Sequence, residues 1–347
     1  MLPPDLPAVE PEFLARFGTD EACRDYLFRL RWPTGFECVR CRGRHCYVHK
    51  KRIIYECKAC RKQHSLLAGT IFEQTKTSLS KWFLAIYYVT VSKRGLSAAE
   101  LQRRLGFVSD QTAWTWLHKI RRAMVAPNRT PLTGTVEVDE VFIGGPKPGT
   151  GGRGAAGKVL VAGAVETRLV QVLPKTSKKP LHGIVRKKVE QRAARLARKA
   201  EAAMMRCLGR CRLAIVPDAS GNSLEAFVAV AVAPAAAVTT DSWKGYYGLA
   251  CKGFAHTAIN ISKSSGKAHQ YLPAVHLVFS HIQRWLLGTH HGAVRIKHLQ
   301  RYLDEYTFRF NRRSLKPVTA RLGRLLEIAL QTPPAPYWRI VGRPGPS

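Results

Sequence analysis

The sequence has few acidic residues and no long hydrophobic run. Its 347 residues include 23 Asp and Glu against 56 Lys and Arg, for a formal net charge of +33. No apolar run approaches the ~18 residues that a membrane-spanning helix needs. Residues 1–10 also lack the basic and apolar segments of a secretory signal. We therefore expect no membrane association and no export. The hydrophobic content of 46% excludes a wholly disordered basic protein.

An excess of positive charge this large indicates a polyanionic partner, and nucleic acid is the first candidate. The alternative is a protein that is merely cationic, as many ribosomal proteins are. The length predicts two or three domains. At the two ends of the chain we expect a flexible N-terminus over residues 1–20 and a Pro-rich tail over 326–347.

The nine cysteines do not suggest disulfides, because their number is odd and no export signal is expected. Four of them form two Cys-x-x-Cys pairs, Cys38 with Cys41 and Cys57 with Cys60. Two such pairs predict a closed, tetrahedral and structural Zn²⁺ site. A pair of redox motifs is the alternative. Cys207 and Cys211 are spaced for one face of an expected helix, and we interpret them as structural.

Cations are concentrated around the four paired cysteines, within a zinc ribbon that we place at residues 21–75. Basic side chains on a small zinc-stapled hairpin commonly contact phosphates. The alternative is a solvated charged surface. The candidate DNA contacts here are Arg40, Arg42, Arg44, Lys51, Arg52, Arg61 and Lys62.

Residues 76–128 have the pattern of a helix-turn-helix region. After a buried helix at 79–92, a capping box begins a short helix at Ser97, and Gly106 ends it. Ser109 or Asp110 then caps a helix that runs to about Met124. In a helix-turn-helix the second helix enters the major groove, whereas a generic helical hairpin would have no such role. The candidate DNA contacts on it are Thr112, Thr115, Lys119 and Arg122.

Strands and helices alternate over residues 132–325, which predicts an α/β domain with a mixed sheet flanked by helices. Strands are expected at 135–143, 158–166, 169–173, 212–216 and 238–241, and helices at 223–232, 273–287 and 302–312. A basic helical insertion is expected at 183–211. It could contact phosphates or be simply solvated.

Two aspartates at strand ends are the candidate catalytic acids. Strand periodicity places Asp139 and Glu137 on one face, and Asp139 precedes the turn at Gly144. Asp241 ends a second expected strand. Two such carboxylates can hold divalent cations, Mg²⁺ or Mn²⁺, that activate a water or a 3′-hydroxyl against a phosphodiester. The alternative is that each aspartate only caps a turn.

A third carboxylate is lacking, since residues 242–303 contain no Asp or Glu. The candidate third group is therefore a histidine on the helix at 273–287. His276 shares a polar side of that helix with Gln283, and His281 is the rival on another side. Imidazole can bind a divalent metal or transfer protons. The alternative is a half-exposed histidine hydrogen-bonded to a neighbour.

Several separated motifs resemble one family. CVRC…CKAC with GTIFEQTKTSLSKWFLAIY resembles the zinc-ribbon leader of a group of bacterial insertion-sequence transposases. GTVEVDEVFIGG, GKVLVAGAVE, RLAIVPDAS, VTTDSWKGYYGL and RWLLGTHHGAV resemble the catalytic domain of the same group, in the same order. The resemblance covers residues 20–325. It implies a ribonuclease-H-like catalytic domain and DDE-type, Mg²⁺-dependent DNA strand transfer.

The resemblance also implies roles for individual residues. Asp139 and Asp241 match the family's first and second acids. His276 stands where many members have Glu, and Gln283 stands where they have Lys. Some members are similar in having His or Asn at the Glu position, which implies a D-D-H site.

On this basis we expect a transposase whose ribbon and helix-turn-helix recognise terminal inverted repeats. Arg284, on the same expected helix as His276, is a further candidate DNA contact. Because two DNA ends must be joined to a target, we expect a homo-oligomer assembled on DNA. A cytoplasmic, nucleoid-associated location in a bacterium follows. The alternatives are a DNA-binding regulator that has lost catalysis and a nuclease of the same fold without strand transfer.

Overall fold

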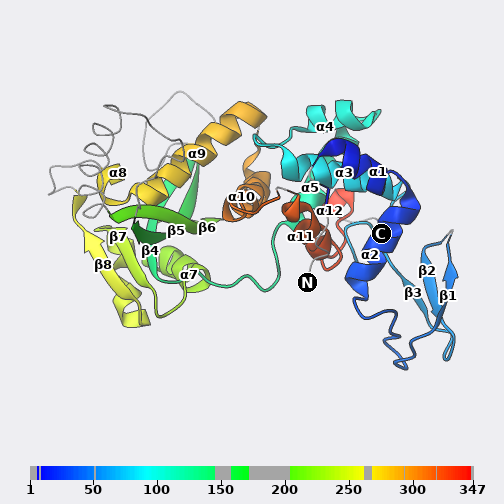
Figure 1. Ribbon diagram of the computed structural model, residues 1–347. Coiled ribbons are helices and arrows are strands. Elements are labelled where there is room, and N and C mark those ends of the chain that lie inside the picture. Colours follow the sequence, from blue (N-terminus) through cyan, green and yellow to red (C-terminus); the bar gives the residue numbers. More distant parts are fainter. Residues whose placement is uncertain are drawn as a thin grey trace, which may run out of the picture. The chain divides into compact units, whose positions relative to one another are not determined.

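A computed structural model of the chain describes residues 6–7, 9–50, 52–144, 158–171, 204–261, 268–292, 294–317 and 319–344. The chain divides into two compact units, shown in Figure 1. The first consists of residues 1–129 and 282–347, and the second of residues 130–281. No helix within the described ranges combines the length and the hydropathy that crossing a bilayer would require.

The first unit is helical except for a small three-stranded sheet. That sheet is antiparallel, with strand order β1-β2-β3. The elements are α1 (Glu10–Phe17), α2 (Asp20–Arg31), β1 (Cys46–His49), β2 (Ile54–Cys57), β3 (Gln63–Ser65), α3 (Leu79–Val91), α4 (Ala98–Leu105), α5 (Asp110–Ala123), α10 (Ile296–Asn311), α11 (Ala320–Ala329) and α12 (Tyr337–Ile340).

The helices α3, α4 and α5 confirm the sequence prediction closely, because their ends are encoded locally. Ser97 Oγ accepts a hydrogen bond from Glu100 N, and Gly106 ends α4 with a φ of 64°. Ser109 caps α5 through Gln111 N. The three helices share one core, in which Trp82 of α3 stacks on Trp116 of α5 with ring centroids 3.7 Å apart.

Both ends of the chain are more ordered than the sequence suggested. The prediction of a flexible N-terminus over residues 1–20 is wrong for α1, which buries Phe13 and Phe17 in the helical core. The prediction of a Pro-rich tail over 326–347 is also wrong for most of that segment. The end of α11 is buried, and the chain continues through α12. Residues 21–31, expected in the ribbon, belong to helix α2.

The second unit is a five-stranded mixed sheet with order β6-β5-β4-β7-β8. β4 (Thr135–Ile143), β5 (Val159–Gln171) and β6 (Met204–Ile215) pair antiparallel, whereas β4, β7 (Ala237–Asp241) and β8 (Ala255–Ile259) pair in parallel. The other elements are α7 (Gly221–Ala231), the 3₁₀ helix η1 (Lys244–Lys252), α8 (Ala268–Tyr271) and α9 (Pro273–His290), whose last residues belong to the first unit. This arrangement confirms the mixed α/β class and is consistent with a ribonuclease-H-like fold.

The alternation of β4 divides its side chains between the two faces of the sheet. Val136 and Val138 are fully buried in a cluster with residues of α7 and η1. Glu137 turns to the other face, where it contacts the start of α9. Figure 1 shows α7 and α9 on opposite sides of the sheet. One face of β4 is therefore a core, and the other carries the acids.

The strand predictions need two corrections. Residues 158–166 and 169–173 were expected to form two strands, but β5 is one strand as far as Gln171. The prediction of a helical insertion at 183–211 is wrong for residues 204–211, which belong to β6. Cys207 and Cys211 therefore lie on a strand. Residues 183–203 lie outside the described ranges.

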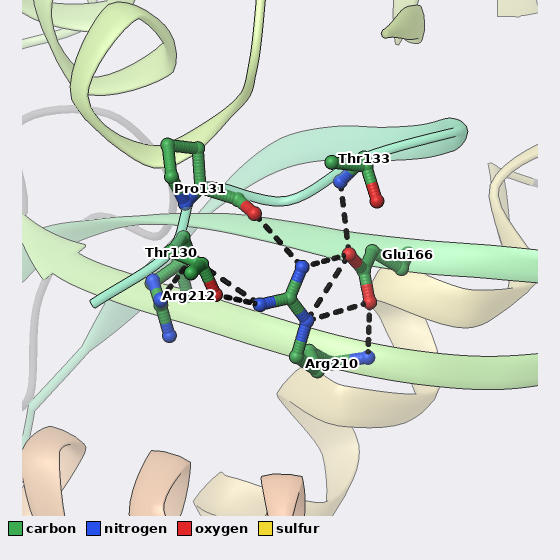
Figure 2. Close-up of polar contacts among 6 residues, drawn as sticks. All are labelled: Thr130, Pro131, Thr133, Glu166, Arg210 and Arg212. Atoms are coloured by element: carbon green, nitrogen blue, oxygen red, sulfur yellow. Dashed lines mark hydrogen bonds and ion pairs between the residues drawn. The ribbon is translucent and has the colours of Figure 1, made fainter.

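A buried ion pair fixes the start of β4 to the edge of this sheet (Figure 2). Glu166 of β5 is 1% exposed and accepts hydrogen bonds from Thr133 N, Arg210 N and the Arg210 guanidinium. The same guanidinium donates to Thr130 and Pro131. The register between β5 and β6 shifts at this point. The backbone of β6 comes so close to Glu166 that a Cβ at Gly209 would lie 2.6 Å from Glu166 Cβ, and only glycine fits there.

Candidate active site and zinc site

The two candidate catalytic aspartates lie on adjacent parallel strands. β4 and β7 pair with Glu137 opposite Thr239, and the same register carried on by two residues places Asp139 opposite Asp241. Asp139 Oδ1 accepts a hydrogen bond from Glu140 N at 2.8 Å, and Asp241 Oδ1 accepts one from Trp243 N at 3.0 Å. Each carboxylate is thereby oriented by the backbone next to it.

His276, on the first turn of α9, lies against Asp139. The distance between His276 Nε2 and Asp139 Oδ2 is 3.2 Å. The Nε2 atom is buried and has no hydrogen-bond partner among the described residues, so the two atoms are close without hydrogen-bond geometry. Burial and the nearby His269 lower the pKa of His276 below 6.5, although Asp241 opposes the shift. The imidazole is therefore neutral at pH 7.

Glu137 holds the start of α9. Its side chain is buried, and Oε2 accepts hydrogen bonds from Ala274 N at 2.7 Å and Val275 N at 3.1 Å. The helix begins at Pro273, which has no N–H to satisfy. The carboxylate thus supplies the acceptor that the first turn needs, one residue before His276.

A glycine beside Asp139 also leaves room for α9 to pack close to the sheet. Gly163 of β5 is opposite Asp139 in the β4–β5 register. A Cβ at Gly163 would lie 2.5 Å from the Phe279 ring of α9, which is closer than real Cβ contacts allow. A glycine at this position is therefore part of what lets His276 reach Asp139.

Glu140 and Tyr246 form a contact that sequence reasoning missed. The Tyr246 hydroxyl donates to Glu140 Oε2 at 2.7 Å. Burial and the Glu140 charge raise the pKa of Tyr246 well above 10, and Asp139 and Asp241 contribute in the same direction. Tyr246 therefore stays protonated and donates its hydroxyl proton to Glu140. No local signal predicts this pair, because the two residues are 106 positions apart.

The other candidates on α9 are exposed. His281 lies five residues beyond His276, about 140° round the helix, and its side chain is exposed. Gln283 and Arg284 are exposed further along.

The four cysteine sulfurs of the ribbon converge. The Sγ atoms of Cys38, Cys41, Cys57 and Cys60 all lie within 4.8 Å of one another. Sulfurs bound to one tetrahedral Zn²⁺ at ~2.3 Å are about 3.8 Å apart, and two of the pairs here are at 3.5 Å. The arrangement fits a structural zinc.

The two cysteine pairs have the same backbone geometry. Arg42 N donates to Cys38 O and Arg61 N to Cys57 O, at 2.9 and 3.0 Å. Arg42 and Arg61 both adopt a left-handed conformation, with φ near 60°. His64 Nε2 lies 3.3 Å from Cys38 Sγ and supports that ligand from outside the four.

The predicted DNA contacts differ in accessibility. On the ribbon, Arg42 pairs with Glu37 and Arg61 with Glu56, and Lys51 lies outside the described residues. Arg42 and Arg61 are nevertheless exposed, as are the other predicted contacts Arg40, Arg44, Arg52 and Lys62. On α5, all four predicted contacts, Thr112, Thr115, Lys119 and Arg122, are only half-exposed, because α3, α4, α10, α11 and α12 pack around this helix.

Comparison with known proteins defines the class to which this fold and these sites belong. The model of a transposase zinc-ribbon domain matches residues 18–63. The model of the ISXO2-like transposase domain matches residues 131–311, which is more than half of the chain. The chain belongs to the ISXO2-like transposase family.

Two curated relatives are similar over shorter stretches. An uncharacterized protein in transposable element ISH50 of Halobacterium salinarum is 31% identical over 140 residues, 40% of this chain and 45% of that protein. An uncharacterized transposase-like protein of Haemophilus influenzae is 27% identical over 116 residues, 33% of this chain and 93% of that protein. The chain thus spans less than half the length of the Halobacterium relative. Comparison with solved structures gives no significant match.

Proposed function

We propose that this protein is a DNA transposase that cuts the ends of a mobile element and joins them to target DNA. The observation that carries the proposal is the convergence of Asp139 and His276 next to Asp241 on the sheet face under α9. The transposase family and the net charge of +33 support DNA as the substrate.

The donor set fits a hard divalent cation. In an octahedral Mg²⁺ site with bonds of ~2.1 Å, adjacent donors are about 3.0 Å apart, close to the 3.2 Å between His276 Nε2 and Asp139 Oδ2. The buried, unpartnered Nε2 is the atom that such an ion would satisfy. Asp139, Asp241 and His276 would hold Mg²⁺ or Mn²⁺, which activates the attacking oxygen and stabilises the leaving one.

The residues of the chain contribute orientation and charge. A backbone N–H group orients one oxygen of each aspartate. The neutral His276 keeps a lone pair available, because its pKa is below 6.5. Attack by a water would release the 3′-hydroxyl of the element, and attack by that hydroxyl on a target phosphodiester would join the two strands with departure of the target's own 3′-oxygen.

The zinc ribbon and the helices α4 and α5 would recognise the terminal inverted repeats. Exposed cations of the ribbon, Arg40, Arg44, Arg52 and Lys62, would contact phosphates. Arg284 would contact DNA near the site, and Gln283 would lie beside it. Since two ends react together, the active form would be a homo-oligomer assembled on DNA.

Variants of the two aspartates test this proposal. Asp139→Asn and Asp241→Asn should each abolish Mg²⁺-dependent cleavage of DNA that carries the ends flanking the gene, with DNA affinity changed no more than a few-fold. Glu225→Gln is the matched control, because Glu225 lies on α7, on the other face of the sheet, and pairs with Lys252. Cleavage that persists in both aspartate variants would show that the site is elsewhere. Cleavage by the wild type without joining would indicate a nuclease.

A further inference from the structure

The helical unit contains a cavity of about 480 Å³ at the start of two helices. Asp110 and Gln111, at the start of α5, form one wall. Residues at the start of α10 and around α12 form the others. The side of α5 that opens to this cavity is its first turn, and not the half-exposed face on which the candidate DNA contacts lie.

Three cations line the cavity. Arg295 and Lys297 lie at the start of α10, and Arg343 follows α12. All three side chains are exposed, so their charges are available at its rim. Asp110 is the one carboxylate among the described lining residues. The excess of cations favours an anionic ligand.

His298 supplies a buried polar group in the wall. It is 8% exposed and lines the cavity. Its ring packs on those of Trp114 and His118, with centroids 5.0 and 4.9 Å away. Burial and the charges of Lys297 and Arg295 lower the pKa of His298. The neutral imidazole retains one N–H that can donate to an oxyanion.

The start of α10 adds to the positive potential. Its N-cap, Arg295, makes no side-chain capping hydrogen bond, and the first turn of a 16-residue helix carries a partial positive charge. Fixed charge and helix dipole thus act in the same direction.

We propose that this cavity binds a backbone phosphate of DNA through Arg295, Lys297, Arg343 and His298. The site rests on the proposed function, since it takes DNA as the ligand, and it adds a contact surface made by α10 and the C-terminal segment. The aromatic rings of Trp114 and Tyr337 form an apolar floor on which a deoxyribose can pack.

The test is the salt dependence of DNA binding by the full-length, zinc-loaded protein. The variant Arg295→Gln/Arg343→Gln removes two exposed cations of the cavity. Lys297 is kept because it donates to Val341 O. The control Arg29→Gln/Lys76→Gln removes two exposed cations that do not line the cavity. The probe is a fluorescein-labelled 30-base-pair duplex, measured by anisotropy at several salt concentrations.

Each phosphate contact contributes about 0.9 to the slope of log affinity against log salt. Because the cavity holds one phosphate, the cavity variant should bind with a slope shallower by about 0.9, and the control should keep the wild-type slope. Equal slopes for the two double variants, changed or unchanged, would overturn the cavity as a phosphate site. A wild type that binds no DNA would instead reject the proposed function, so the two failures are distinguishable.

Discussion

In the proposed site, the surroundings of His276 explain its protonation state. Burial removes water from the imidazole, which disfavours the protonated form, and the nearby His269 adds to the effect. The charge of Asp241 opposes the shift. A proton on Nε2 would compete with a metal for the same lone pair. The residue is therefore suited to bind a cation at neutral pH and to lose it in acid.

The first prediction at this scale concerns pH. A lowered pKa in the folded state means that His276 is neutral at pH 7 and down through 6.5, and it is protonated only below that pH. Mg²⁺-dependent cleavage should therefore be level from pH 8 to about 6.5 and decline below it. His276→Ala should reduce cleavage by about 100-fold or more, equivalent to about 2.7 kcal/mol, and His281→Ala should stay within a few-fold. An inactive His281 variant beside an active His276 variant would reverse the assignment.

At the scale of elements, helix α9 is positioned by contacts from two strands. Glu137 accepts from its first free N–H groups, and Gly163 leaves space for Phe279. Asp139 is close to both positions, because it lies two residues after Glu137 on β4 and opposite Gly163 of β5. Loss of either contact would move His276 relative to Asp139.

Glu137 and Glu166 form a matched pair for testing this positioning. Both are 1% exposed carboxylates of the same sheet, but Glu166 binds Arg210 and not α9. Glu137→Ala and Glu166→Ala should each lower the free energy of unfolding by about 1–3 kcal/mol, because each leaves buried N–H groups without their acceptor. Only Glu137→Ala should also reduce cleavage in conditions where both variants are folded. Urea unfolding and cleavage assays measure the two effects.

The variant Glu137→Gln separates position from charge. Its amide oxygen can still accept from Ala274 N and Val275 N, so it should restore most of the activity that Glu137→Ala loses. If Glu166→Ala impairs cleavage as much as Glu137→Ala does, the loss reflects stability alone, and the positioning role is wrong.

The elements that the sequence predicted best are those with local end signals. Ser97, Gly106 and Ser109 fix the ends of α4 and α5 within a few residues. β6 was partly mistaken for a helix because the bulge near Gly209 interrupts the alternation of its side chains. Helix α1 is short, and it depends on tertiary contacts such as the packing of Phe13 and Phe17.

At the scale of the whole molecule, the chain with its charge of +33 divides into two compact units. The candidate acids could be found in the sequence because carboxylates are few in the chain. Asp241 ends β7 as expected, whereas Asp139 lies in the middle of β4. The roles of Glu137, Tyr246 and the cavity at α10 could not be found in the sequence, since each depends on residues brought together from distant positions. The same packing that builds these sites half-buries the predicted DNA contacts of α5.

The central claim is that Asp139, Asp241 and His276 hold a divalent cation, and Mn²⁺ titration followed by electron paramagnetic resonance tests it most directly. The wild-type protein with its zinc in place should bind Mn²⁺, and Asp139→Asn and Asp241→Asn should each weaken that binding by more than about tenfold. Glu225→Gln should bind as the wild type does. Unchanged Mn²⁺ affinity in both aspartate variants would contradict the account.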